Sequence, residues 1–497
     1  MNRTGVAKKP SCAWIPTIAV LSVAVLVSGA CAPGTSGPAP ATTPSATVSA
    51  TPQGPTPDLD GLSKLDHLVF IVMENRSFDS YFGTYPGADG IPQDVCVPDP
   101  GFDGRCQRPY HDTGIRDGGG PHSYDAAVTD IHGGKMDGFL QAAKEQPYTD
   151  CAAEGTAKAC EGHVGPTGQL DVMGHHDRNE IPLYWQLADW GVLQDRMFAP
   201  TDSWTLPAHL FLMSAWSAVC SDHNDPMSCD SAIGRPGSPR LELPQYRGDT
   251  PYAWTDITYL LDEQGVSWGY YVSPDGTCYL LSCDSLGSGH MTTGYQNPMP
   301  GFLTVKEHGT SSNIQPYTKY ERAAHSGDLP SVSWVIPGID ESDHPGHGTV
   351  VDGQRFVAQM VNAATQGPDW GSTAIFVVWD DWGGFYDHVA PPRIDLNGYG
   401  IRVPGLMVSP YAREGYIDTQ ILSFDAYLKL IEDRFLGGSR LDPKTDGRPD
   451  PRPTVREEVG QLGNLLSEFD FNQAPRQLPV LQPPGESRGS RQPPTSP

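Results

Sequence analysis

Two uninterrupted apolar runs constrain the fold of this chain more than any other feature. Residues 66–74 (DHLVFIVME) and 374–379 (AIFVVW) are rich in Val, Ile and Phe, and polar residues occur only near the ends of the first run. Runs of this length and composition are typical of strands buried on both faces of a sheet. The sequence therefore predicts two buried strands.

Further apolar strands alternate with helical patterns along the chain. Strands are predicted at 266–272, 331–336 and 403–408, and helices at 180–188, 257–264, 353–364 and 424–435. This alternation favours an α/β fold, in which a layered β-sheet is flanked by helices. Two cysteine-bearing segments, 90–165 and 215–300, are predicted to be loop-rich insertions.

The N-terminus has the order of a secretory signal. Basic residues precede an apolar stretch at 15–27, and small residues then lead to Cys31. The stretch is shorter than the roughly 20 residues that a membrane span needs, so a signal peptide over 1–31 and export are expected. Two outcomes stay open: lipid attachment at Cys31, which resembles a bacterial lipoprotein cleavage site, or ordinary cleavage nearby, which would release a free protein.

Two other terminal segments differ in composition from the body of the chain. Residues 32–60 are mainly Pro, Thr, Ser and Ala, which is typical of a linker. Residues 475–497 are dominated by Pro, Arg, Gln, Gly and Ser, and they are predicted to be a disordered tail. One large folded domain is thus expected at 61–474, with a length that accommodates insertions.

The cysteines support export. Eight of them follow the signal, and they fall in sequence-adjacent pairs: Cys96 with Cys106, Cys151 with Cys160, Cys220 with Cys229, and Cys278 with Cys283. In an oxidising compartment, four short disulfide loops are the simplest pairing, although sequence alone does not fix it. A zinc cluster is the alternative, but the chain has no C-x2-C spacing.

The charge balance narrows the class of partner. The chain has 59 Asp and Glu against 33 Lys and Arg, a net charge of −26. This argues against nucleic acid, because binding it depends on basic residues that neutralise phosphates. It does not exclude a phosphorylated substrate, because a bound cation can reverse the local potential.

Acidic residues follow both apolar strands directly. Glu74 and Asn75 come after the first strand, and Asp380 and Asp381 come after the second. Adjacent carboxylates repel unless a positive group lies beside them, and oxygen ligands suit a hard divalent cation. Taken singly, these residues could cap a turn or form a solvated acidic turn. Together they favour a metal site.

Hydroxyl and histidine side chains supply further candidates. Ser203 and Thr205 lie in a hydroxyl-rich loop at 201–209, and a hydroxyl becomes a nucleophile when a base or metal lowers its pKa. His122 and His344 lie in loops rich in Gly and Pro, where phosphate ligands and general acids often occur. Each of these residues alone could equally be a turn or surface residue.

A G-x-S-x-G pattern at 265–269 resembles the nucleophile elbow of serine hydrolases. That elbow requires a strand before the pattern and a helix after it. Here a helix precedes it and a strand follows, so the first glycine is better explained as a helix terminator.

Four segments together resemble the bacterial phospholipase C and acid phosphatase family, within the alkaline-phosphatase-like superfamily of phosphoesterases. They are HLVFIVMENRSFDSYFG, PAHL, SDHPG and DDWGGFYDHVAPP, and the match extends from about Leu65 to about Phe435. The resemblance implies a mixed sheet flanked by helices and metal-dependent hydrolysis of phosphate esters.

The resemblance also implies roles for particular residues. Metal ligands would be Glu74, Asn75, Thr205, Asp380 and Asp381, and the ion could be calcium, zinc or magnesium. Thr205 would be the nucleophile because it lies two residues before Pro207, although Ala208 stands where the family usually has Asn; Ser203 is the reserve. Asn75, His122 and His344 would contact the phosphate, and a histidine would protonate the leaving group. Trp382 replaces the usual His or Asn after the acidic pair.

The expected protein is an exported phosphoesterase of the phospholipase C type that works through a phosphothreonine. A broad-specificity acid phosphatase is the first alternative, and a stalked, non-catalytic surface-binding protein is the second. The acidity of the chain disfavours an anionic bilayer, so zwitterionic phospholipid or soluble phosphoesters are the expected substrates.

Overall fold

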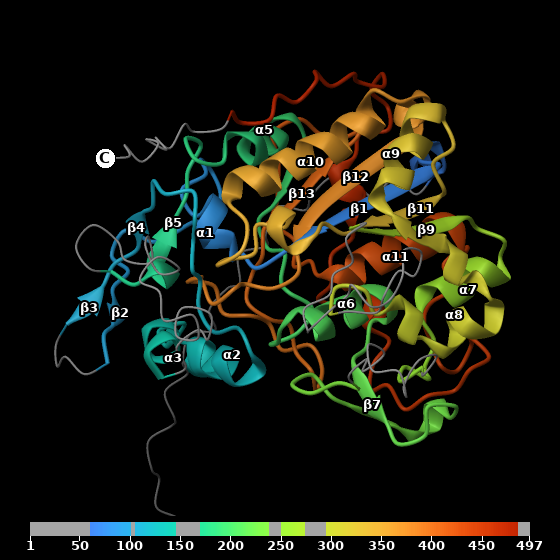
Figure 1. The fold of residues 1–497 in the computed structure, drawn as a ribbon, viewed down its shortest axis with the longest axis horizontal. Coiled ribbons are helices and arrows are strands. Elements are labelled where there is room, and N and C mark those ends of the chain that lie inside the picture. The colour runs from blue at the N-terminus through green and yellow to red at the C-terminus, as the bar shows by residue number, and fades with distance from the viewer. Residues whose placement is uncertain (1–59, 101–104, 146–168, 238–249, 274–294, 486–497) are drawn as a thin grey trace, which may run out of the picture. The chain divides into compact units, whose positions relative to one another are not determined.

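The computed structural model describes residues 60–100, 105–145, 169–237, 250–273 and 295–485. Its centre is an eight-stranded sheet in the order β10-β9-β11-β1-β12-β13-β6-β14 (Figure 1). The strands are β1 (His67–Met73), β6 (Val192–Gln194), β9 (Trp268–Val272), β10 (Ile314–Pro316), β11 (Val332–Val335), β12 (Thr373–Trp379), β13 (Gly405–Val408) and β14 (Tyr416–Asp418). β13 runs antiparallel to both neighbours and the other adjacent pairs are parallel. The predicted mixed sheet is confirmed.

Helices cover both faces of this sheet (Figure 1). One face carries α1 (Phe78–Phe82), α5 (Pro182–Trp190), α9 (Tyr317–Ser326) and α10 (Val350–Thr365), and the other carries α6 (Thr205–Ser214) and α11 (Phe424–Phe435). Tyr427 of α11 packs against Phe70 and Phe376, with ring centroids 5.1 Å apart in both pairs. Trp379 points to the opposite face, where it meets Tyr184 of α5 at 5.0 Å. The central strands are therefore covered on both sides.

The predicted elements are present with shifted ends. α10 begins at Val350 rather than at 353, because Thr349 and Asp352 form a reciprocal capping box. α7 (Ile257–Glu263) is followed by Gly265, with a φ of 66°, and then by β9. This helix–glycine–strand order confirms that the G-x-S-x-G pattern is not a nucleophile elbow. Within the described ranges, no helix is both long and apolar enough to span a bilayer.

The insertions contain short elements and disulfides. They include α2 (Tyr124–Ile131), α3 (Phe139–Glu145), β2 (Val97–Pro98), β3 (Cys106–Gln107), β4 (Tyr110–His111), β7 (Ala218–Cys220) and β8 (Cys229–Ser231). Just beyond them lie β5 (Gly174–His175), which pairs with β4, and α8 (Leu303–His308). Cys96 is bonded to Cys106, and Cys220 to Cys229, as predicted. The other two predicted pairs, at 151–160 and 278–283, lie outside the described residues.

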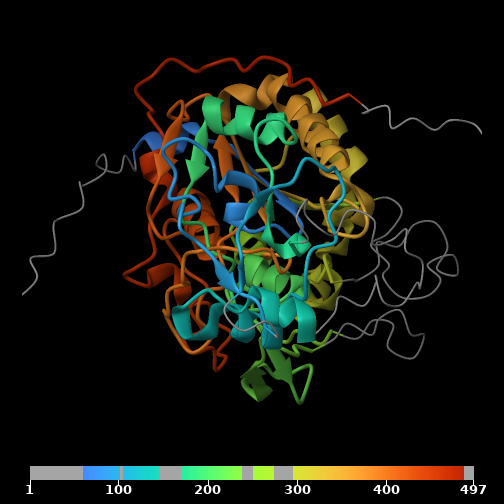
Figure 2. The same ribbon diagram turned by 90° about the vertical axis from the view of Figure 1, so that its left-hand side faces the viewer.

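The expectation of a disordered tail from residue 475 is wrong for its first part. Figure 2 shows the C-terminal segment running along the helical face that carries α5 and α10. Leu481 and Asn362 of α10 exchange two hydrogen bonds, of 2.8 and 2.9 Å. The carbonyl of Arg476 accepts a hydrogen bond from Trp370. Leu478 and Leu481 are buried, and their apolar side chains explain why this Pro-rich segment packs against the body.

Replacing Leu481 with alanine should destabilise the protein. The side chain is 2% exposed, and truncation of a buried leucine typically costs about 2–4 kcal/mol of unfolding free energy. Val480 is the matched control, because it is 49% exposed and its replacement by alanine should change stability by less than about 0.5 kcal/mol. Urea denaturation of both variants checks this, and equal midpoints would contradict the packing of the segment.

Candidate active site

Two neighbouring strands deliver acidic residues to the same edge of the sheet. β1 and β12 are parallel, and Met73 is in register with Trp379. The amide of Asp380 donates to the carbonyl of Met73 at 3.0 Å, which continues the ladder past the strand ends. Glu74 and Asp380 therefore lie side by side at the carboxyl end of the sheet, where ligands bind in open α/β folds.

Helix α6 adds a hydroxyl and an imidazole to these acids. Thr205 is the first residue of α6, and His209 lies one turn later on the same face of the helix. The Thr205 hydroxyl lies beside the Asp380 carboxylate, and His209 Nε2 lies 4.0 Å from Asp380 Oδ2. One ligand atom each from Glu74, His209 and Asp380 lies within 4.8 Å of the others.

The electrostatics of this cluster fit a divalent cation. Burial raises the pKa of Glu74 well above its ordinary value, and the neighbouring Asp380 raises it further. Burial, followed by the charge of Asp381, raises the pKa of Asp380, and burial raises that of Asp381. Asp380 Oδ2, Asp381 Oδ2 and His209 Nε2 have no hydrogen-bond partner among the described residues. A metal ion would satisfy these atoms and balance the buried negative charge.

Asn75 is fixed between the two acidic strand ends. Its φ of 64° lies in the left-handed region, which asparagine tolerates better than most residues. Its backbone amide donates to Asp380 Oδ1 at 3.1 Å. The side chain is fully buried, and neither its nitrogen nor its oxygen has a hydrogen-bond partner within the described residues. The amide is therefore able to bind a metal or a phosphoryl oxygen.

His122 and His344 lie together, with ring centroids 6.0 Å apart. The Nδ1 of His122 donates to the carbonyl of Gly120 at 2.9 Å, and the Nδ1 of His344 donates to that of Pro345 at 2.7 Å. The Nε2 of His344 lies 4.0 Å from Glu74 Oε2. Burial, then the nearby His122, lowers the pKa of His344 well below its ordinary value.

Two residues hold the histidine side of the site. Asp171 Oδ2 accepts hydrogen bonds from the amides of Gly118 and Gly119, both at 2.7 Å, in the loop that leads to His122. Trp382 is fully buried, its Nε1 donates to Asp130, and its ring lies 6.4 Å from that of His122. Trp382 therefore forms a wall beside His122.

A comparison with known proteins identifies the family of this chain. The sequence profile described as "Phosphoesterase family" matches residues 65–436. The chain belongs to the phosphoesterase family. Membership makes it a hydrolase that acts on phosphoric ester bonds, as the resemblance in its sequence implied.

Three relatives of this phosphoesterase carry phospholipase C names. "Phospholipase C B" of Mycobacterium tuberculosis is 27% identical over 470 residues, which cover 85% of this chain and 80% of that protein. "Non-hemolytic phospholipase C" of Pseudomonas aeruginosa is 25% identical, covering 75% of this chain and 54% of that protein. "Non-specific phospholipase C1" of Arabidopsis thaliana is 27% identical, covering 70% and 61%.

Solved structures were compared as well. A protein in the alkaline phosphatase superfamily from Vibrio parahaemolyticus has a TM-score of 0.31 and 13% identity, covering 51% of this chain and 60% of that one. The PsFucS1 sulfatase from Pseudoalteromonas has a TM-score of 0.33 and 10% identity, covering 76% and 72%.

The structure brings together most of the residues predicted for this phosphoesterase. Glu74, Asn75, Thr205, Asp380 and Asp381 meet at the sheet edge, with His122 and His344 beside Glu74. Ser203 is different, because its hydroxyl donates to the carbonyl of Ile233 at 2.6 Å and thus holds a loop.

Sequence reasoning missed His209 as a member of the site. The 201–209 segment was expected to be a loop, whereas Thr205 already starts α6. Pro207 fits the first turn of a helix, and the spacing of four residues from Thr205 would then have placed His209 on the same face. Gln296, which donates to Glu74, lies in an insertion and had no comparable signal.

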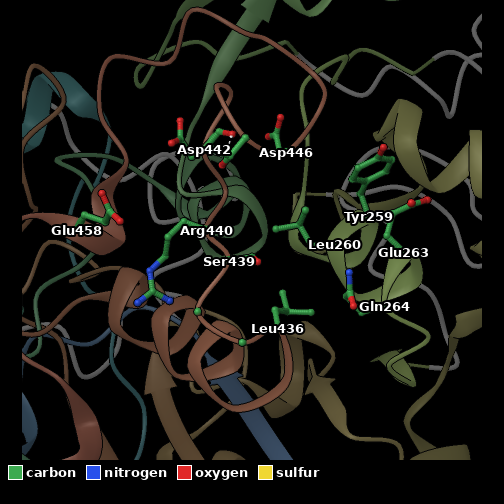
Figure 3. A pocket seen from close by; sticks show the side chains of 13 residues that line it. Tyr259, Leu260, Glu263, Gln264, Leu436, Ser439, Arg440, Asp442, Asp446 and Glu458 are labelled. Atoms are coloured by element: carbon green, nitrogen blue, oxygen red, sulfur yellow. Dashed lines mark hydrogen bonds between the residues drawn. The ribbon is translucent and has the colours of Figure 1, made fainter.

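A separate cavity of about 500 Å³ lies away from this cluster. Figure 3 shows it between α7 and the loop that follows α11. Its charged lining residues are Glu263, Arg440, Asp442, Asp446 and Glu458, and the arginine is paired with Asp433 at 2.6 Å. None of the residues that line it belongs to the acidic cluster.

Replacing Gly383 with alanine should disrupt the site of this phosphoesterase. Gly383 has a φ of 61°, and a Cβ there would lie 2.5 Å from the carbonyl oxygen of Asn75. We expect a loss of at least about 2 kcal/mol of unfolding free energy, together with most of the activity. Gly371 is the matched control, because a Cβ there meets no atom within 4 Å. Thermal melts and turnover check this, and a fully active Gly383→Ala variant would contradict the tight packing at Asn75.

Proposed function

We propose that this chain is an exported, metal-dependent phosphoesterase of the phospholipase C type that works through a phosphothreonine at Thr205. The observation that carries the proposal is the position of the Thr205 hydroxyl next to the Asp380 carboxylate, within the buried acidic cluster. The phospholipase C names of its relatives support the substrate class.

The metal would be held by Glu74, Asn75, Thr205, Asp380 and Asp381. Their oxygen donors suit a divalent cation, and the raised pKa values of the three acids indicate that a positive charge is needed there at neutral pH. When bound, the ion would lower the pKa of the nucleophile and stabilise negative charge on the phosphoryl oxygens.

The phosphoryl group would be oriented by neutral donors. The buried side-chain amide of Asn75 can donate to a phosphoryl oxygen. Thr205 lies at the positive end of α6, whose N-cap residue Trp204 makes no capping hydrogen bond with its side chain. The first turn of a helix favours an anion at this position. These groups would hold the phosphorus in front of Thr205 Oγ1.

The reaction would proceed in two displacements. Thr205 Oγ1 gives up its proton to the neighbouring Asp380 carboxylate and attacks phosphorus, while the bond to the leaving alcohol breaks in line. His122 or His344 would give its proton to the leaving oxygen, and the negative charge of the bound phosphoester would favour the protonated ring that this step needs. Water then attacks phosphorus and returns a proton to the histidine, the bond to Thr205 breaks, and Thr205 recovers its proton from Asp380.

The second candidate is a phosphomonoesterase that releases inorganic phosphate. The same groups would hold the phosphoryl centre, so the two activities differ only in what is attached to it. The names of the relatives favour the diesterase. A non-catalytic, stalked surface-binding protein is disfavoured, because it would have no use for three buried carboxylates at one edge of a sheet.

Export rests on the sequence and on the disulfides. A signal at 1–31, a linker at 32–60 and a phosphoesterase domain that begins at 61 are the proposed arrangement, and the two disulfide bonds fit an oxidising compartment. The mass of the N-terminal peptide of the natively expressed protein tests this. A diacylglycerol on Cys31 would indicate a lipid anchor, ordinary cleavage would indicate release, and an intact 1–31 segment would contradict export.

The substrate class is tested with three phosphoesters. Purified chain is incubated with phosphatidylcholine vesicles, p-nitrophenyl phosphorylcholine and p-nitrophenyl phosphate, with and without a chelator. We expect release of phosphorylcholine from the first two and loss of activity with the chelator. Turnover of p-nitrophenyl phosphate alone would favour the monoesterase, and no turnover of any substrate in the presence of divalent metals would refute both.

A further inference from the structure

We propose that His209 is a nitrogen ligand of the metal and that it makes the site prefer a zinc-like transition-metal ion to calcium or magnesium. The inference rests on the proposed function only in placing a metal among Glu74, Asp380 and Thr205. The imidazole of His209 adds a nitrogen donor to the oxygen donors. A nitrogen donor changes which metal ions the site prefers.

The position of His209 is that of a ligand. The side chain is fully buried, and its Nε2 has no hydrogen-bond partner in the part of the chain that the structure describes. Nε2 lies 4.0 Å from Asp380 Oδ2, and the ligand atoms of His209, Asp380 and Glu74 all lie within 4.8 Å of one another. Bonds of about 2 Å place two ligands of one ion about 3–4 Å apart, so only a small adjustment is needed.

A hydrogen-bond chain fixes which nitrogen faces the cluster. The Tyr270 hydroxyl donates its single proton to the carbonyl of Gln296 at 2.6 Å. It can therefore only accept a hydrogen bond from His209, whose Nδ1 lies 3.3 Å away. The proton of the neutral ring is thus on Nδ1, and Nε2 presents its lone pair to the acids. Metal-bound histidines are oriented by such second-shell partners.

The same chain reaches a second ligand. The side-chain amide of Gln296 donates to Glu74 Oε1, so one residue supports His209 through Tyr270 and Glu74 directly. This arrangement orients a nitrogen donor and an oxygen donor toward the same point. A role in packing alone would not explain why His209 Nε2, which has no hydrogen-bond partner among the described residues, lies beside the carboxylates of Glu74 and Asp380.

The donor set determines the preferred ion. Calcium and magnesium prefer oxygen ligands, whereas an imidazole nitrogen favours zinc and neighbouring transition metals. The imidazole of His209 adds one nitrogen donor to the oxygen donors already proposed, and zinc accommodates mixed nitrogen and oxygen sets in catalytic sites. The structure therefore favours zinc as the probe ion over calcium.

Metal titrations of the chelator-stripped full chain test the ligand. Calorimetry should show that the wild type binds zinc at least about 100-fold more tightly than calcium. His209→Ala should weaken zinc binding by at least about 100-fold and change calcium binding by less than about threefold. Tyr270→Phe, which leaves every ligand in place, should weaken zinc binding by about 10-fold or more. Equal zinc affinities in the wild type and His209→Ala would overturn the proposal.

X-ray absorption at the zinc edge keeps the test valid if His209→Ala fails to fold. The wild-type spectrum should contain the scattering pattern of one imidazole, and a zinc shell without imidazole would overturn the proposal. Zinc bound through an imidazole in a chain that hydrolyses no phosphoester would refute the proposed function but leave this inference standing. Hydrolysis that runs on calcium and is unchanged in His209→Ala would refute this inference alone.

Discussion

Replacement of Thr205 with alanine is expected to lower kcat for phosphoester hydrolysis by at least about 10³-fold, because the variant lacks the atom that attacks phosphorus. Thr205 begins α6, and its hydroxyl lies beside the Asp380 carboxylate. Alanine is a good helix former, so the fold should be retained. Steady-state kinetics with p-nitrophenyl phosphorylcholine, together with circular dichroism, measure both effects.

Two control variants separate chemistry from packing. Thr205→Ser keeps a hydroxyl at the same place and should retain a substantial part of the activity. Ser203→Ala removes a buried hydroxyl that donates to Ile233, so it should cost about 1 kcal/mol of stability and leave turnover largely unchanged. If Ser203→Ala is inactive and Thr205→Ala is active, the nucleophile has been misassigned.

Removal of the metal is expected to abolish activity and to destabilise the protein. Burial and mutual repulsion raise the pKa values of Glu74 and Asp380, so in the metal-free protein their charges oppose folding. A metal present at about 100 times its Kd would contribute about 2.7 kcal/mol to the free energy of unfolding. Chelation should remove this contribution, which thermal melts with and without chelator measure.

In the Asp380→Asn variant, chelation of the metal should no longer change the free energy of unfolding. The variant lacks a ligand charge, so metal should raise its free energy of unfolding by less than about 1 kcal/mol. Its metal-free form should be at least as stable as the metal-free wild type, because a buried carboxylate has been neutralised. Asp230→Asn is the matched control, because Asp230 is exposed on β8. Equal chelator effects in Asp380→Asn and the wild type would contradict the metal site.

The sheet and the acidic part of the site were predictable from local sequence. β1 and β12 are continuous apolar runs, and each runs directly into acids, so their parallel pairing was enough to bring Glu74 beside Asp380. The resemblance to the family supplied Thr205, His122 and His344. These residues could be found because each follows a recognisable strand or motif.

Other contacts depend on tertiary packing that no local pattern encodes. His209 required knowledge that α6 begins at Thr205, and Asp171 contacts the His122 loop from 53 residues beyond Gly118 in the sequence. The segment around Leu481 looks disordered by composition, yet two leucines and a reciprocal pair of hydrogen bonds with Asn362 hold it to α10. In each case the tertiary contacts of a few side chains determine the structure, and the composition of the local sequence does not reveal them.

The phosphorylated intermediate tests the central claim most directly. Enzyme mixed with phosphoester substrate is quenched in acid during turnover, digested and examined by mass spectrometry for a phosphoryl group on the peptide that contains Thr205. We expect phosphate on Thr205 in the wild type and none in Thr205→Ala. Turnover that leaves Thr205 unmodified while another residue carries the phosphate would contradict it.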